Sequence, residues 1–309
     1  MVRQRFLVPP RGGSNPPAPT NFLKYKDFLF VKKTEHETSK KIEKASVDEA
    51  FFCSPETFVH PTAVIGSSVS LGTGVKIGPY TTIVGTVVIG DNTRISPYVS
   101  IGYPAQNIGV TQSLGTVEIG SNCDIREFVS IHASKYEAGK TIIGNNCYIM
   151  CHAHVAHDCV LEDNVTLINN VNLGGHTHVC QKAIVMANSA THQFCKIGRL
   201  TALAPFSGIR QDLPPFCLFS GQPARYYGLN VIGLKRAGFS SADINALKHV
   251  AKLFYNDKCG VQELVEFGQK EAWGKISLVQ EFVTFIQQSS RGVSRGTALS
   301  GDRDQENIG

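Results

Sequence analysis

The sequence contains one tryptophan and no apolar run close to the roughly 18 residues that a membrane-spanning helix needs. We therefore expect a soluble protein with no stable membrane insertion. The nine cysteines include no CxxC pair, which argues against a disulfide framework and a typical zinc motif and favours a reducing compartment. The net charge of +5 is spread along the chain instead of forming a basic stripe, so we expect no nucleic-acid partner.

The first 50 residues differ in composition from the rest of the chain. The first 26 contain five basic residues, five prolines and no acidic residue. Basic residues without acidic ones are typical of a transit peptide, but prolines interrupt the amphipathic helix that such a peptide forms. We expect residues 1–50 to be an extension that is disordered or serves in targeting.

An aliphatic residue recurs every six positions from Val59 to Ile209. Of the 26 positions in this series, 22 are Ile, Leu or Val, and glycine often follows the aliphatic residue. A six-residue period of this kind is the signature of a parallel β-helix. Each hexapeptide supplies one short strand with its aliphatic side chain inward, three hexapeptides make one coil, and successive coils stack about 4.8 Å apart. We expect a mainly β fold, with this coil over residues 51–215.

Two stretches interrupt the aliphatic series without changing its phase. Asn107 and Ser113 occupy series positions in the first stretch, and Glu137 occupies one in the second. We expect both stretches to be loops extruded from the coil. Long loops on a rigid scaffold often carry function, but a tolerated insertion explains them equally well.

The chain after the coil has a different pattern. Pro214 and Pro215 end the repeat, and Ser240 with Asp243 resembles a capping box at the start of a helix. Apolar residues at helical spacing follow in three further runs. We expect a small C-terminal α-helical domain over residues 216–292 and a disordered tail over residues 293–309.

Three histidines and an aspartate lie within a short stretch of the repeat, at His152, His154, His157 and Asp158. Residues 18 positions apart stack on successive coils, so this stretch and the following ones form a polar patch along one edge. The patch consists of His157, Asp158, Gly175, His176, His192 and Gln193.

The polar patch has three interpretations. It can be a column of turn residues chosen for polarity and small size. It can be a metal site, although Cys147, Cys151 and His154 cannot easily converge because neighbouring strand residues point to opposite faces. It can also be a general-base site, in which His157 takes a proton from a hydroxyl and Asp158 stabilises the resulting imidazolium.

In the general-base interpretation, the backbone N–H of Gly175 faces a developing oxyanion. No serine or cysteine nucleophile is placed beside the histidine, so the chemistry implied is direct acyl transfer between two bound substrates.

Several blocks of sequence in this order resemble the acyl-carrier-protein-dependent UDP-N-acetylglucosamine O-acyltransferase family. The resemblance extends from Phe58 to Gly292. The blocks that carry it are residues 154–159, 173–176, 192–194, 211–215 and 230–239.

The resemblance implies a left-handed β-helix and a homotrimer with active sites between subunits. The implied reaction is the first step of lipid A synthesis, in which a 3-hydroxyacyl group passes from acyl carrier protein to the 3-hydroxyl of UDP-N-acetylglucosamine, with no metal or other cofactor. The implied location is the bacterial cytoplasm, or the mitochondrial matrix if the N-terminal extension is a transit peptide.

The resemblance also implies roles for individual residues. His157 matches the catalytic base, Asp158 its partner and Gly175 the oxyanion donor. The remaining matches are to substrate-binding positions: His154, His176 and Gln193 on the sugar and acyl side, Gln106 in the first extruded loop, and His192, Asn230 and Arg236 near the nucleotide and its phosphates.

Four residues depart from the family pattern near the substrates: Asn107, Gly109, Ile232 and Ala237. They leave open the length of the acyl chain and whether the acceptor is an amino or an acetamido sugar. Two alternative functions also stay open, namely a zinc enzyme of the gamma carbonic anhydrase type and a non-catalytic trimer that binds a UDP-sugar.

Overall fold

The computed structural model describes residues 56–112, 114–256 and 259–296, and all of these lie in one compact unit. The predicted extension at residues 1–50 lies outside the described residues, as do residues 297–309 of the predicted tail. Within the described ranges, no helix is long and apolar enough to cross a membrane.

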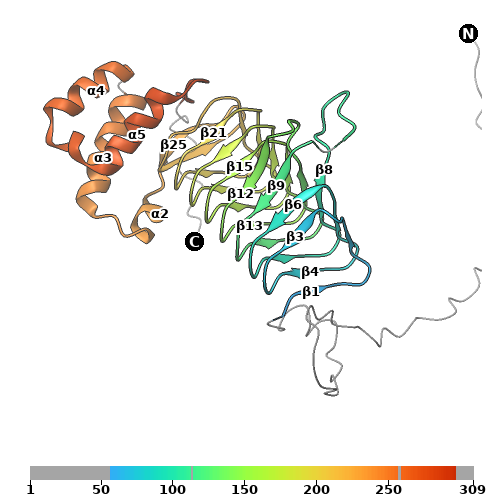
Figure 1. Cartoon of the computed structure of the whole chain (residues 1–309). Coiled ribbons are helices and arrows are strands. Elements are labelled where there is room, and N and C mark those ends of the chain that lie inside the picture. Colours follow the sequence, from blue (N-terminus) through green and yellow to red (C-terminus); the bar gives the residue numbers. More distant parts are fainter. Residues whose placement is uncertain (1–55, 113, 257–258, 297–309) are drawn as a thin grey trace, which may run out of the picture. The chain divides into compact units, whose positions relative to one another are not determined.

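The first part of the described chain winds through three parallel sheets in turn (Figure 1). The first sheet contains β1 (Phe58–Val59), β4 (Lys76–Ile77), β7 (Arg94–Ile95), β10 (Asp124–Ile125), β13 (Tyr148–Ile149), β16 (Thr166–Leu167), β19 (Ile184–Val185) and β22 (Ala202–Leu203), with β24 (Cys217–Ser220) and β25 (Arg225–Leu229) at its end. The second sheet contains β2 (Val64–Ile65), β5 (Thr82–Ile83), β8 (Ser100–Tyr103), β11 (Ser130–His132), β14 (His154–Val155), β17 (Asn172–Leu173), β20 (Ala190–Thr191) and β23 (Gly208–Ile209). The third sheet contains β3 (Val69–Leu71), β6 (Thr86–Ile89), β9 (Thr116–Ile119), β12 (Lys140–Ile143), β15 (Val160–Leu161), β18 (His178–Val179) and β21 (Lys196–Ile197).

The predicted aliphatic series forms the core of this coil. Ile77, Ile83, Ile149 and Leu167 are fully buried, and most other members of the series are buried with them. In most strands of the coil the series residue is buried and its neighbour is more exposed, because successive side chains of a strand alternate between its two faces. The first strand, β1, is an exception, since Val59 is exposed and Phe58 is buried. The sequence prediction of a parallel coil is therefore confirmed.

The two extruded loops are also confirmed by the register of the strands. Most partners are 18 residues apart, as in Val155 opposite Leu173. The spacing is 30 from Ile95 to Ile125 and 24 from Ile125 to Ile149. The extra 12 and 6 residues are whole hexapeptides, so the inward series resumes in phase after each loop.

Most corners of the coil place one residue in the left-handed backbone region. These residues recur every six positions, as at Asn146, His152, Asp158 and Asn164, with φ near +60°. Asn and Asp tolerate this conformation better than most residues that carry a side chain. The corner geometry sets the positions of Asp158 and His176, which both adopt it.

The coil ends in the antiparallel pair β24–β25, and helices follow: α2 (Val231–Arg236), α3 (Ser241–Tyr255), α4 (Val261–Lys270), the 3-10 helix η1 (Ala272–Lys275) and α5 (Ser277–Gln288). The Ser240 hydroxyl accepts a hydrogen bond from the Asp243 N–H at the start of α3, as the capping pattern predicts. The Asp243 carboxylate accepts from the Ser240 hydroxyl, at 2.7 Å, and so departs from a full capping box.

Two buried or partly buried contacts join the helices to the last coil. Arg199 forms a bidentate pair with Glu281 of α5, with a shortest N–O distance of 2.6 Å. Asp212 is buried, and its carboxylate accepts hydrogen bonds from the Lys196 N–H and the Ser289 hydroxyl, each at 2.7 Å. The helices therefore pack against a specific end of the coil.

Candidate functional site

A cavity of about 370 Å³ lies along the second sheet and the corner that follows it. It brings together five of the residues predicted to be functional: Gln106, His154, His157, Gly175 and Gln193. The other lining residues are Asn107, His132, Ala156, Asn172, Leu173, Gly174, Ala190 and Thr191.

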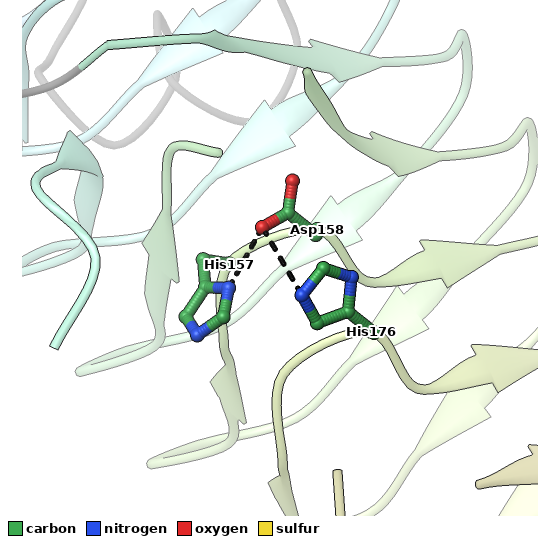
Figure 2. Close-up of side chains that lie close together, drawn as sticks. All are labelled: His157, Asp158 and His176. Atoms are coloured by element: carbon green, nitrogen blue, oxygen red, sulfur yellow. Dashed lines mark hydrogen bonds and ion pairs between the residues drawn. The ribbon is translucent and has the colours of Figure 1, made fainter. Parts of the chain in front are cut away.

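His157 and Asp158 form a hydrogen-bonded pair beside this cavity (Figure 2). The distance from His157 Nδ1 to Asp158 Oδ2 is 2.8 Å, and each side chain is only 8% exposed. An ionised carboxylate only accepts hydrogen bonds, so Nδ1 carries the proton in this contact. Nε2 of the neutral ring is then free to accept a proton from a bound molecule.

Asp158 is held by the second extruded loop and by the neighbouring strand. The Ser134 hydroxyl donates to Asp158 Oδ1, and Ser134 is fully buried. The Thr141 hydroxyl accepts from the Asp158 N–H at 2.8 Å. The Ser134 hydroxyl itself accepts from the Tyr136 N–H at 3.0 Å. Ser134 holds Oδ1 and His157 holds Oδ2, so the orientation of the carboxylate is fixed.

Gly175 lies over the His157 ring. A Cβ at this position would come within 2.5 Å of His157 Cε1 and 2.7 Å of Nε2, so any larger residue would displace the imidazole. Among the described residues, the Gly175 N–H has no hydrogen-bond acceptor. It is therefore available to a bound molecule.

His176 approaches the same carboxylate from the next coil. Its Nε2 lies 3.7 Å from Asp158 Oδ2 and its ring packs edge-on against His157 (Figure 2). The ring also stacks on Phe194, at 4.4 Å between centroids. Burial lowers the pKa of His176. No hydrogen-bond partner for its Nε2 exists in the described part of the chain.

His154 is held in a different way, by residues that the sequence analysis did not identify. Its Nδ1 lies 2.8 Å from the Ser130 hydroxyl, and its ring packs edge-on against His132 at 5.2 Å between centroids. His132 donates from Nδ1 to the Pro104 carbonyl at 2.6 Å. Burial, with smaller contributions from His132 and His157, lowers the pKa of His154 to about 4.

The remaining predicted residues lie away from the cavity lining. His192 is exposed, and its Nδ1 lies 3.3 Å from an Arg291 nitrogen. Asn230 caps α2 through its carboxamide oxygen, which accepts from the Gly233 N–H, and its Nδ2 donates to the Leu200 carbonyl. Arg236 is exposed in the last turn of α2.

Two sets of side chains in the described residues have the composition and spacing to hold a metal ion. One is His157, Asp158 and His176, and the other is Glu162, His178 and Cys180. In the first set, His157 Nδ1 and Asp158 are already engaged with each other and with Ser134. That arrangement suits proton transfer at the free Nε2.

Family profiles match both parts of the fold. A profile described as bacterial transferase hexapeptide (six repeats) matches residues 68–103 and 140–175. A profile described as UDP N-acetylglucosamine O-acyltransferase, domain 2, matches residues 212–294. The prediction of a left-handed β-helix followed by C-terminal helices is confirmed.

Whole-chain comparisons give the same result. The chain is 38% identical over 261 residues to the acyl-(acyl-carrier-protein)–UDP-N-acetylglucosamine O-acyltransferase of Thermodesulfovibrio yellowstonii, covering 84% of this chain and 98% of that protein. It is 36% identical to the enzyme of the same name from Thiobacillus denitrificans, covering 77% and 99%. The crystal structure of the Francisella novicida UDP-N-acetylglucosamine acyltransferase superposes with a TM-score of 0.70 at 31% identity, covering 79% of this chain and 95% of that one.

The low pKa of His154 predicts a loss of stability in acid. The pKa of about 4 in the folded state lies below the ordinary value of 6.5, so protonation favours the unfolded chain. Above about pH 6.5 the ring is neutral in both states and the full free energy of unfolding is present. As the pH falls towards 4, the free energy of unfolding decreases by about 2 kcal/mol, a value reduced because the ring is partly exposed. Denaturant unfolding measured at pH 6.5 and at pH 4 should show a smaller decrease in the free energy of unfolding for His154→Gln than for the unaltered protein. Equal losses would contradict the prediction.

Proposed function

The chain belongs to the acyl-(acyl-carrier-protein)–UDP-N-acetylglucosamine O-acyltransferase family, and from this premise we propose how its own residues carry out the reaction. The reaction is transfer of a 3-hydroxyacyl group from acyl carrier protein to the 3-hydroxyl of UDP-N-acetylglucosamine, the first step of lipid A synthesis. The observation that carries the proposal is the 2.8 Å contact between His157 and Asp158 beneath Gly175, at the wall of the cavity.

The catalytic step begins at His157. Its free Nε2 takes the proton of the sugar hydroxyl as the oxygen attacks the thioester carbonyl carbon. The Asp158 carboxylate, 2.8 Å from Nδ1, stabilises the imidazolium that forms. A neutral histidine with one nitrogen fixed by a carboxylate is suited to this role at neutral pH.

The second half of the step uses Gly175. The carbonyl oxygen becomes negatively charged in the tetrahedral intermediate, and the unoccupied N–H of Gly175 donates a hydrogen bond to it. When the intermediate collapses, the bond from carbon to sulfur breaks. The thiolate of the carrier leaves and takes the proton from the His157 imidazolium, which returns the base to its starting state.

The remaining predicted residues are proposed to bind the substrates. Gln106, His154 and Gln193 line the cavity and are placed to contact the sugar and the acyl chain. His176, which stacks on Phe194 and lies near the Asp158 carboxylate, is proposed to act on the same side. His192, Asn230 and Arg236 are proposed to contact the nucleotide. The exposed guanidinium of Arg236 suits a phosphate.

The first extruded loop contributes a residue that is proposed to influence which acceptor sugar binds. Asn107, one of the departures from the family pattern, lines the cavity beside Gln106. A carboxamide can donate and accept hydrogen bonds but carries no charge. Its presence there bears on the choice between an amino and an acetamido acceptor.

The comparisons favour acyl transfer over the two alternatives. The relatives carry the name of the acyltransferase over nearly their whole length, and the C-terminal helices match the second domain of the same family. The zinc-enzyme and binding-only interpretations have no such support.

The protein is further proposed to act as a homotrimer in the bacterial cytoplasm, with acyl carrier protein as its donor partner. Within one chain, Asn230 and Arg236 lie outside the cavity lining. A second subunit that completes the nucleotide end of the site accounts for this separation. Bacterial relatives support this location, and import into mitochondria is the alternative.

The proposed trimer predicts the mass of the particle in solution. Sedimentation or native mass spectrometry should give three times the chain mass of 33.6 kDa. A single-chain mass under the conditions of full activity would overturn both the trimer and the shared site.

The proposed base predicts the effect of His157→Ala. With 3-hydroxyacyl carrier protein and UDP-N-acetylglucosamine, this change should lower kcat by about 10²-fold or more, because the hydroxyl loses its proton acceptor. His249→Ala, an exposed position on α3, serves as the control and should keep normal activity. Comparing donors of several chain lengths and both acceptor sugars in the same assay would define the substrates. Normal turnover in the His157 variant would remove the proposed mechanism.

The contact between Ser134 and Asp158 predicts a positioning role for the serine. Ser134→Ala leaves Asp158 Oδ1 without its donor, so kcat should fall about tenfold while KM stays unchanged. Ser189→Ala is the matched control, since Ser189 is also fully buried and its hydroxyl donates to the Ala204 carbonyl at 2.9 Å. Equal effects of the two changes on kcat would mean that Ser134 acts on stability alone.

A further inference from the structure

A second cluster of ligand-type side chains lies on the third sheet, and none of its members lines the cavity. His178 and Cys180 are two residues apart at β18, so their side chains leave the same face of the strand. Glu162 lies 18 residues before Cys180 and therefore one coil away in register, since Val160 pairs with His178. The coil geometry brings an imidazole, a thiol and a carboxylate to one point.

The three side chains are close enough to share an ion. One ligand atom from each lies within 4.8 Å of the other two. Glu162 Oε1 accepts from His178 Nε2 at 2.7 Å, and its Oε2 accepts from the Gln181 N–H at 2.9 Å. Cys180 is 8% exposed and forms the buried side of the cluster.

The composition of the cluster selects the kind of ligand. Thiolate, imidazole and carboxylate are the three donors that zinc prefers in proteins, and three protein ligands leave a fourth tetrahedral position for water. We propose that Glu162, His178 and Cys180 bind one zinc ion. The Cys180 thiol releases its proton to solvent as sulfur binds, so the thiolate and the Glu162 carboxylate together balance the charge of the ion.

Stability of the folded chain does not by itself explain this arrangement. The Glu162 and His178 side chains are 41% and 36% exposed, and exposed ion pairs typically contribute less than about 1 kcal/mol. The neighbouring outward residue on β21 is Lys196, which pairs with His178 in register. Its ammonium lies over the Phe285 ring, 5.4 Å from the centroid.

A zinc ion here would tie β15 to β18 near the end of the coil where α5 packs. It would act on stability and not on the acyl transfer step, since His157, Asp158 and Gly175 belong to a different edge. The inference therefore stands or falls separately from the proposed function.

Cobalt is the probe that tests the site, because a thiolate bound to cobalt absorbs in the near ultraviolet through sulfur-to-metal charge transfer. The other candidate set, His157, Asp158 and His176, contains no sulfur. The full chain, stripped with a chelator and titrated with cobalt, should show this band with one equivalent bound. Adding one equivalent of zinc should abolish it.

Variants assign the band to these residues. Cys180→Ser should remove it, and Glu162→Gln should weaken cobalt binding at least about tenfold, through loss of one ligand. Cys151→Ser is the matched control, since Cys151 is a partly exposed cysteine that donates to Glu127 instead, and it should leave the band unchanged. Thermal unfolding should show a higher Tm with zinc for the unaltered protein and for Cys151→Ser but not for Cys180→Ser.

Two outcomes would overturn the zinc site. One is the absence of the charge-transfer band in the unaltered protein at one equivalent of cobalt. The other is a band that survives in Cys180→Ser. Acyl transfer measured on the same samples distinguishes this failure from a failure of the proposed function.

Discussion

The in-register stacking of hexapeptide strands is the constraint on which the rest of the structure depends. Each inward aliphatic residue lies over another, as Val155 lies over Leu173, and a slip by one residue would turn a whole strand's apolar side chains to the outside. This is why both extruded loops add whole multiples of six residues. A loop of any other length would require every later strand to change its inward position.

The same constraint brings together the side chains of the sequence neighbours His157 and Asp158, the catalytic dyad proposed above. His157 precedes the corner and reaches the cavity wall, whereas Asp158 occupies the left-handed corner position at φ 61° and turns its carboxylate back towards the imidazole. Most corner positions in this part of the coil carry asparagine or other residues without a charge. Asp158 therefore differs from the other corner residues in its side chain but shares their recurring backbone geometry. The coil alone sets its position, and no special loop is needed.

The part of the site that depends only on the 18-residue spacing could be predicted from the sequence. Gly175 over His157 and His176 beside Asp158 follow from that spacing alone. Ser134, Ser130 and His132 could not be placed in the same way, because their offset to the dyad includes the six residues of the second loop. The path of such a loop, and which of its hydroxyls turns towards Asp158, depend on packing that a repeat does not encode. Similarly, no sequence pattern distinguishes the capping role of Asn230 from a contact with a nucleotide.

Gly174 and Gly175 are adjacent in the chain, but their backbone N–H groups differ in their hydrogen bonds. Both glycines line the cavity, and the 18-residue spacing places Gly175 over the His157 ring. Thr191 interrupts the aliphatic series one coil further on, and its hydroxyl accepts from the Gly174 N–H at 3.0 Å and bonds to Thr177 at 2.8 Å. The Gly174 N–H also donates to the Thr191 backbone carbonyl at 3.2 Å, whereas no acceptor for the Gly175 N–H is found among the residues described. The backbone bond does not depend on the side chain at position 191, so the threonine hydroxyl adds a second acceptor to an amide that the coil already engages.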